Sequence, residues 1–173
     1  MENQLRSPGF TLIELIVVML VMGILAAVFI PRSNNPAIIL STQAEQFAAD
    51  IRYVQSLAMT EGWSGVSPAV SRRYRINYSA TSYNFTDVSG VAVSHPSGTP
   101  GSIVFAGGAS ISPLPASNLP NNLIAFDGLG RPYTNDIATT LLASTVTATI
   151  SMVSGGATRA IQIFPETGLV RVQ

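Results

Sequence analysis

The chain has 173 residues, which is enough for one domain of ordinary size together with one additional segment. Nine basic residues balance nine acidic ones, and only 10% of the residues are charged, so the overall charge indicates neither nucleic acid nor an acidic ligand as a partner. Every basic residue is an arginine and cysteine is absent, which excludes lysine Schiff bases, a P-loop lysine, disulfides and cysteine nucleophiles. We therefore expect a domain held together by packing alone, with no enzymatic activity and no cofactor.

An apolar stretch of 21 residues, Phe10–Ile30, dominates the N-terminal region, and its only charge is Glu14. As an α-helix it would be about 31 Å long, which matches the hydrocarbon core of a bilayer and predicts a transmembrane helix. By itself the pattern also fits a signal anchor or a cleaved secretory signal. The stretch is longer than the apolar region of a secretory signal, and a carboxylate at the centre of a bilayer costs about 2.5–3.5 kcal/mol. Glu14 therefore needs a partner.

Cleavage after Gly9 would supply that partner, because the new amino group of Phe10 would lie four residues before Glu14 at a helix N-terminus. The segment Gly9-Phe10-Thr11-Leu12-Ile13-Glu14-Leu15 resembles the prepilin motif of type IV pilins and type II secretion pseudopilins. This resemblance implies that a prepilin peptidase removes residues 1–9 and methylates the Phe10 amine. It also implies that Glu14 sets the register of the subunit during assembly.

The same resemblance implies further properties of the N-terminal region. Gly23 and Pro31 stand where pilins often carry a helix-weakening glycine and a kinking proline. The expected partners are other pilin or pseudopilin subunits, the prepilin peptidase and an inner-membrane assembly platform, and nucleic acid is not expected. The expected location is the inner membrane, as a single-pass protein with its head in the periplasm, and then a filament in the periplasm or on the cell surface.

The remaining chain predicts a helix followed by strands. Apolar residues recur at three- and four-residue spacing over residues 38–61, which predicts an amphipathic helix with Asp50 and most other polar residues on its outer faces. Residues 89–122 are rich in Gly, Pro and Ser and predict a long loop region with one strand. Alternating hydrophobicity predicts strands at Arg73–Tyr78, Tyr83–Val88, Ser102–Ala106, Leu123–Asp127, Thr145–Val153, Arg159–Phe164 and Leu169–Val172.

These elements define the expected domains and fold class. Residues 1–9 form the prepilin leader, residues 10–31 the transmembrane and assembly helix, and residues 32–173 the periplasmic or extracellular head. The head is expected to contain the amphipathic helix 38–61 and a β-sheet over residues 72–173. The fold class is α+β, with a long N-terminal helix packed on an antiparallel sheet as in pilins.

Three segments carry a finer resemblance, to the H-type minor pseudopilins of type II secretion and to minor pilins of the mannose-sensitive haemagglutinin pilus system. This resemblance implies a minor subunit near the filament tip. The three segments are Gln43–Ala58, Phe126-Asp-Gly-Leu-Gly-Arg-Pro132 and Glu166-Thr-Gly-Leu-Val-Arg-Val172.

Isolated polar residues of the head provide candidates for a metal site. His95 is the only histidine and lies in the loop-rich region, so we expect a solvated loop residue rather than a ligand. Asp127 and Asp136 flank a Gly-rich segment that could surround calcium with oxygen atoms. Because Asp, Asn and Gly form turns readily, a structural turn is the favoured interpretation of that segment.

Arginines provide a candidate for DNA binding. Arg72, Arg73 and Arg75 lie close to Tyr74 and Tyr78, which is the composition of a small phosphate-and-stacking patch. On an alternating strand the tyrosines would face the core, so a solvated strand face is favoured. The C-terminal segment adds one further arginine to the candidate DNA contacts, Arg171. The alternative to a structural subunit is therefore a membrane-anchored or tip-located module that binds DNA or a secreted substrate, and an anchored hydrolase ranks below both.

Overall fold

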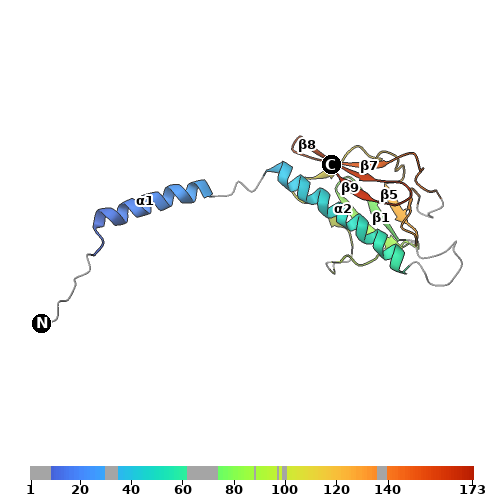
Figure 1. Ribbon diagram of the computed structural model, residues 1–173, viewed down its shortest axis with the longest axis horizontal. Coiled ribbons are helices and arrows are strands. Elements are labelled where there is room, and N and C mark those ends of the chain that lie inside the picture. Colours follow the sequence, from blue (N-terminus) through green and yellow to red (C-terminus); the bar gives the residue numbers. More distant parts are fainter. Residues whose placement is uncertain are drawn as a thin grey trace. The chain divides into compact units, whose positions relative to one another are not determined.

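A computed structural model describes residues 9–29, 35–61, 74–87, 89–96, 98, 101–135 and 140–173. The chain divides into two compact units, Met1–Asn34 and Asn35–Gln173 (Figure 1). We call Asn35–Gln173 the head. Pro31, Arg72, Arg73 and Asp136 lie outside the described residues.

The described residues of the first unit form one helix, α1 (Leu12–Phe29). Thr11 caps its N-terminus, because Thr11 Oγ1 accepts a hydrogen bond from the backbone N–H of Glu14 at 3.3 Å. The large apolar side chains from Leu12 to Leu25 are 46–78% exposed within the chain and follow one another on all sides of α1, whose one charged residue is Glu14. Helices with this pattern are typically buried in a larger assembly or in lipid. Of the described residues, none belongs to a helix that is both long and apolar enough to cross a membrane.

The head begins with α2 (Pro36–Glu61), two residues earlier than the sequence predicts. Asn35 caps this helix, because its Oδ1 accepts a hydrogen bond from the Ala37 N–H at 3.0 Å. Pro36 occupies the first helical position, where a backbone N–H would have no partner within the helix, so its missing N–H does not destabilise the helix. One face of α2 is buried. Its members are Leu40, Ala44, Phe47, Ala48, Asp50, Ile51, Val54 and Ala58.

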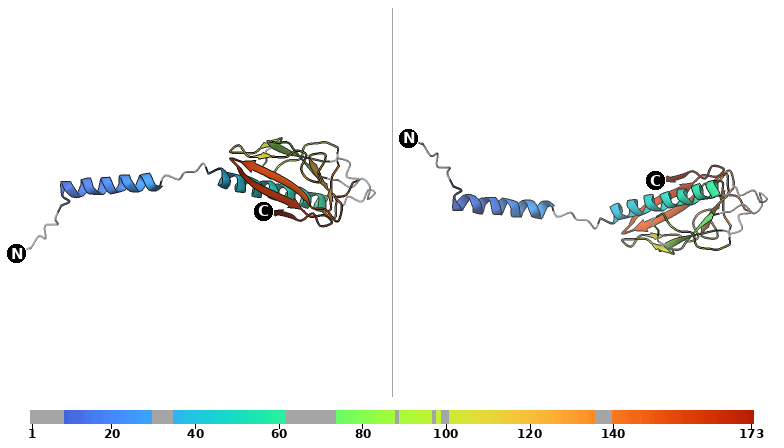
Figure 2. Two further views of the ribbon diagram at one scale, coloured as in Figure 1. Left: turned by 90° about the horizontal axis from the view of Figure 1, so that it is seen from above. Right: turned by 90° about the horizontal axis from the view of Figure 1, so that it is seen from below.

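Two antiparallel sheets pack against α2, where the sequence predicted one (Figures 1 and 2). The first has the order β3-β2-β1-β5-β6 and the second the order β4-β7-β8-β9. The strands are β1 (Tyr74–Tyr78), β2 (Ser82–Asp87), β3 (Ile103–Val104), β4 (Ser110–Ile111), β5 (Leu123–Phe126), β6 (Pro132–Tyr133), β7 (Ala148–Ser154), β8 (Ala157–Ile163) and β9 (Val170–Val172).

The predicted strands Arg73–Tyr78 and Tyr83–Val88 correspond to β1 and β2, which pair as an antiparallel hairpin with Tyr74 opposite Asp87 and Tyr78 opposite Tyr83. The sequence missed β4 and β6, because strands of two residues are too short to show alternation. Helix α2 packs on β7, β8 and β9 of the second sheet and on β1 and β5 of the first. It therefore bridges both sheets, and both sheets contribute to the main hydrophobic core.

Aromatic side chains fill the centre of this core. The Phe47 ring on α2 lies 4.7 Å from the ring of Tyr83 and 5.4 Å from the ring of Phe105, measured between centroids. Both sheets add large, fully buried side chains, among them Ile76 and Ile124 of the first sheet and Ile150 of the second. The α+β arrangement predicted from the sequence, a helix packed on antiparallel strands, is thus observed.

Candidate functional site

The Gly9–Phe10 bond lies in exposed backbone without regular structure, two residues before α1 begins. The Phe10 side chain is 81% exposed, and a Cβ placed on Gly9 would meet nothing within 4 Å. A protease binds its substrate in an extended conformation. Among the described residues, no helical hydrogen bond and no packing contact prevents Gly9 and Phe10 from adopting that conformation. The bond is therefore sterically accessible.

Glu14 occupies the third position of α1, in its first turn. Thr11 and Glu14 have the spacing of a capping box, and the N-terminal end of a helix favours a negative charge. The Glu14 side chain is exposed and has no ion pair among the described residues, so its carboxylate is available to a second molecule. Gly23 lies inside α1, where glycine weakens a helix by about 1 kcal/mol relative to alanine.

In the head, the three segments of the finer resemblance meet at one side chain, Gln55 of α2. Its Nε2 donates hydrogen bonds to the carbonyl oxygens of Gly130 at 2.9 Å and Thr167 at 2.8 Å. A Cβ on Gly168 would lie only 2.4 Å from the Gly130 oxygen and 2.5 Å from Gln55 Nε2. Glycine is therefore required at position 168, and Gln55 ties two turns to the helix.

Asp127 is the centre of the turn that the sequence favoured over a calcium site. Its Oδ1 accepts hydrogen bonds from the N–H groups of Leu129 at 3.0 Å and Arg131 at 2.9 Å, and its Oδ2 accepts from Arg131 Nε at 2.8 Å and from the Tyr133 hydroxyl at 3.2 Å. Burial alone would raise the Asp127 pKa, but these bonds and the Arg131 charge outweigh it and hold the pKa below its usual value.

The Arg131 guanidinium thus neutralises the carboxylate that a calcium ion would need. Among the described residues, no three His, Cys, Asp or Glu side chains lie together in a way that could hold a metal. Asp136, the second calcium candidate, lies outside the described residues, so nothing in the described part of the head supports the calcium interpretation.

His95 contradicts the expectation of a solvated loop residue. Its Nε2 lies 3.1 Å from Oδ1 of Asp50, the His95 side chain is 11% exposed, and its ring stacks on Phe85 with centroids 5.4 Å apart. The Tyr83 hydroxyl donates to the other Asp50 oxygen at 2.5 Å. Burial, this hydrogen bond and the Asp50 charge all raise the Tyr83 pKa above its usual value.

Asp50 was expected on an outer face of the helix, but it is 6% exposed. Its position three residues after Phe47 and one before Ile51 places it at the margin of the apolar stripe. A carboxylate that is buried at this margin needs a polar or charged partner. The position of Asp50 in the helical pattern could therefore have indicated a buried pair, although not that His95 is the partner. The pair anchors the segment after β2 to α2.

The described residues do not form the arginine patch that was considered as a DNA-binding site. Tyr74, Ile76 and Tyr78 of β1 are buried while Arg75 is partly exposed, which confirms the predicted alternation. Arg75 Nε donates to Thr86 Oγ1 on the neighbouring strand at 2.7 Å. Arg171 lies on β9 of the other sheet, and Arg72 and Arg73 lie outside the described residues.

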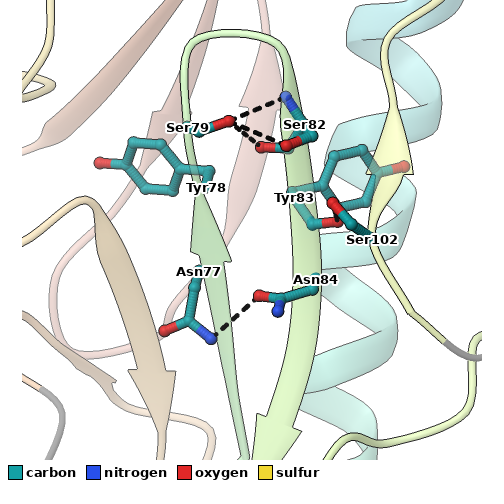
Figure 3. Close-up of a pocket in the computed structure, with 7 residues that line it drawn as sticks. All are labelled: Asn77, Tyr78, Ser79, Ser82, Tyr83, Asn84 and Ser102. Carbon is teal, nitrogen blue, oxygen red and sulfur yellow. Dashed lines mark hydrogen bonds between the residues drawn. The ribbon is translucent and has the colours of Figure 1, made fainter.

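A shallow pocket of about 240 Å³ lies at the β1–β2 hairpin (Figure 3). Asn77 and Asn84 face each other there, with Asn77 Nδ2 donating to Asn84 Oδ1 at 3.1 Å. The pocket contains no carboxylate or imidazole that could activate one of its serines, so it gives no support to catalysis. Its lining residues are Asn77, Tyr78, Ser79, Ser82, Tyr83, Asn84 and Ser102.

Comparison with known families identifies the N-terminal region. Residues 5–30 match the family model described as "Prokaryotic N-terminal methylation motif". The match includes the Gly9–Phe10 bond, Glu14 and the whole apolar stretch Phe10–Ile30. No curated protein and no solved structure matches the chain.

Residues 5–30 therefore carry a prokaryotic N-terminal methylation motif, which supports the resemblance of the N-terminal region to type IV pilin-like proteins. The finer resemblance to H-type pseudopilins and haemagglutinin-system minor pilins is not confirmed by these comparisons.

Proposed function

We propose that the chain is a structural subunit of a type IV pilus or a type II secretion pseudopilus. The prepilin peptidase cuts the precursor between Gly9 and Phe10 and methylates the new amine. The observation that carries this proposal is the methylation motif over residues 5–30, whose cleavage bond lies in exposed, non-helical backbone directly before a capped helix.

Assembly follows from the chemistry of the mature N-terminus. Residues 10–31 hold the subunit in the inner membrane with the head in the periplasm, and the assembly platform transfers it to a filament. In the filament the apolar sides of α1 pack against α1 helices of other subunits, because almost no charge has to be desolvated. The Glu14 carboxylate then pairs with the Phe10 amine of a neighbouring subunit, which fixes the register.

The head supports a structural role. Its described polar clusters, at Gln55, Asp50 and Asp127, all join elements of the fold to one another. By resemblance we propose a minor subunit near the filament tip. Gly23 and Pro31 are proposed to weaken the N-terminal helix during its transfer from the membrane to the filament.

Glu14 variants test the assembly step separately from processing. Glu14→Val is expected to lose its leader normally but to disappear from sheared filaments, because the carboxylate that pairs with the neighbouring amine is gone. Glu14→Asp keeps the charge and serves as the control, with at least partial incorporation. Immunoblots of the membrane and filament fractions measure both steps. Normal incorporation of Glu14→Val would show that Glu14 has no role in register.

Cleavage itself is tested at Gly9. A bulky side chain in Gly9→Val should block entry of the extended backbone into the peptidase, so the precursor keeps residues 1–9. If Gly9→Val and the wild type carry the same N-terminus, the cleavage assignment is wrong.

A further inference from the structure

The pocket at the turn end of the β1–β2 hairpin is lined mainly by neutral polar groups (Figure 3). Five of its seven lining residues are asparagines or serines, and none of the seven is charged, so the site is not built for an ion. The other two, Tyr78 and Tyr83, are only 5% and 3% exposed, so their rings belong to the core. The pocket therefore offers amide and hydroxyl groups rather than an apolar or a charged surface.

Two asparagines on paired strands form one rigid unit in this pocket. Asn77 lies opposite Asn84 in the β1–β2 register, and its Nδ2 donates to Asn84 Oδ1 at 3.1 Å and to Thr86 Oγ1 at 3.0 Å. Among the described residues, the Asn77 Oδ1 acceptor and the Asn84 Nδ2 donors have no partner, and both residues are partly exposed. A fixed acceptor and a fixed donor group thus lie on either side of the bond that joins the two amides (Figure 3).

Three serines add hydroxyl groups around this pair. The Oγ atoms of Ser79 and Ser82 lie 2.9 Å apart at the hairpin turn, and Ser79 Oγ also accepts from the Ser82 N–H at 3.1 Å. Ser102 reaches the pocket from the segment before β3, and its Oγ donates to the Tyr83 carbonyl oxygen at 3.5 Å. A hydroxyl that donates one bond can still accept others, so the Ser102 oxygen remains available to a ligand.

The chemistry of the lining excludes most classes of ligand. Phosphates and carboxylates are bound by arginine or lysine, and Arg75, which shares the outer face of β1 with Asn77, is not part of the pocket. Apolar ligands need pockets lined mainly by hydrophobic side chains. A neutral molecule with several hydroxyl groups fits, because each hydroxyl both donates and accepts. The volume of about 240 Å³ is below the range of about 300–1,000 Å³ for drug-sized ligands, which suits one small ring.

We propose that this pocket binds one pyranose ring of a neutral saccharide. The Asn77 oxygen accepts from one ring hydroxyl, the Asn84 amide nitrogen donates to another, and the Ser102 hydroxyl contacts the ring from the side of β3. The pocket is shallow, so the ring can stand alone or belong to a longer chain. The site uses residues of the head alone, so this inference goes beyond the proposed function and does not depend on it.

Binding of a single ring is expected to be weak. The two tyrosines are buried, so the pocket has no exposed aromatic ring on which a sugar could stack. The contact therefore rests on hydrogen bonds, each of which replaces a bond to water and adds little net affinity. A dissociation constant of about 1–10 mM is expected.

Saturation-transfer difference NMR on the full chain in phosphatidylcholine nanodiscs measures this binding, because the method detects weak ligands and these lipids carry no sugar. The probes are the methyl pyranosides of glucose, galactose and N-acetylglucosamine, each at up to about 20 mM, with glycerol as the acyclic control. At least one pyranoside is expected to show transfer, and glycerol none. The trisaccharide of the sugar that binds distinguishes the two sources: tighter binding than the single ring indicates a chain, and equal binding indicates one unit.

Two variants test the location of the site. Asn84→Asp replaces the amide donors by a carboxylate oxygen but keeps the Oδ1 atom to which Asn77 donates, so binding should weaken about fivefold or more. Ser102→Phe places a bulky ring in the pocket at an exposed position and should abolish binding. Ser144→Phe makes the same change at an exposed serine outside the pocket and is the matched control. Circular dichroism checks the fold of each variant.

The proposal fails if no pyranoside shows transfer, or if glycerol shows as much transfer as the pyranosides. It also fails if either Asn84→Asp or Ser102→Phe binds like the wild type, or if Ser144→Phe loses binding with them, because the sugar is then not held by this pocket. None of these measurements involves leader removal or filament assembly. A negative result here is therefore distinguishable from a failure of the proposed function.

Discussion

Replacing Gly168 by alanine is expected to destabilise the head strongly, because the added methyl has no space. The backbone of Gly168 has a φ of 64°, a region that costs an L-residue about 1–2 kcal/mol. The Cβ would also lie 2.4 Å from Gly130 O and 2.5 Å from Gln55 Nε2. Gln55 would then lose its two hydrogen bonds, at about 0.5–1.5 kcal/mol each. The sum is about 2–5 kcal/mol of unfolding free energy.

Gly108→Ala is the matched control. Gly108 has a φ of 70°, and its Cβ would meet nothing within 4 Å, so this variant carries the backbone cost without the collision. Urea unfolding of Asn35–Gln173, followed by circular dichroism, measures both variants. Gly168→Ala should be less stable than Gly108→Ala by at least about 1 kcal/mol. Equal losses in the two variants would refute the claim that Gln55 joins the two turns to α2.

Two further predictions concern buried polar groups of the head. The Tyr78 hydroxyl has no hydrogen-bond partner among the described residues, so Tyr78→Phe should leave the free energy of unfolding unchanged or raise it. The Tyr83 hydroxyl donates to buried Asp50, so Tyr83→Phe should lower the free energy of unfolding by about 1–3 kcal/mol. Equal urea midpoints for the two variants would contradict this. The Asp127 pKa lies below its usual value near 4, so the stability it contributes is present above about pH 4 and is lost as the pH falls through the lowered pKa. Asp127→Asn should therefore show a shallower loss of stability than the wild type between about pH 5 and pH 2, and parallel curves would argue against the Arg131 interaction.

The elements with strong periodicity could be predicted from the sequence. The apolar repeat of α2 and the alternation of β1, β2, β7 and β8 each give a signal over five or more residues, and the structure confirms these elements to within a few residues. The division into two sheets could not be predicted. The division depends on which strands pair although they are far apart in the sequence. The hydrophobic pattern of a single strand does not indicate its partner.

The polar contacts of the head show a similar limit. The Asp127 turn was predictable because Asp, Gly and Arg occur within five consecutive residues. The Asp50–His95 pair joins residues 45 positions apart, and the Gln55 bonds join residues 75 and 112 positions apart. No local pattern specifies such partners. By contrast, the N-terminal motif is continuous along the chain, so Gly9, Phe10 and Glu14 can be recognised from the order of the residues alone.

The central claim is that the precursor is cut between Gly9 and Phe10 and methylated on the new amine. Mass spectrometry of the intact protein, isolated from membranes of a host that contains a prepilin peptidase, tests this most directly when combined with fragmentation of its N-terminal peptide. We predict a chain that begins at Phe10 and carries one methyl group on that residue's amine. A chain that keeps residues 1–9, or that begins at another residue, would contradict the account.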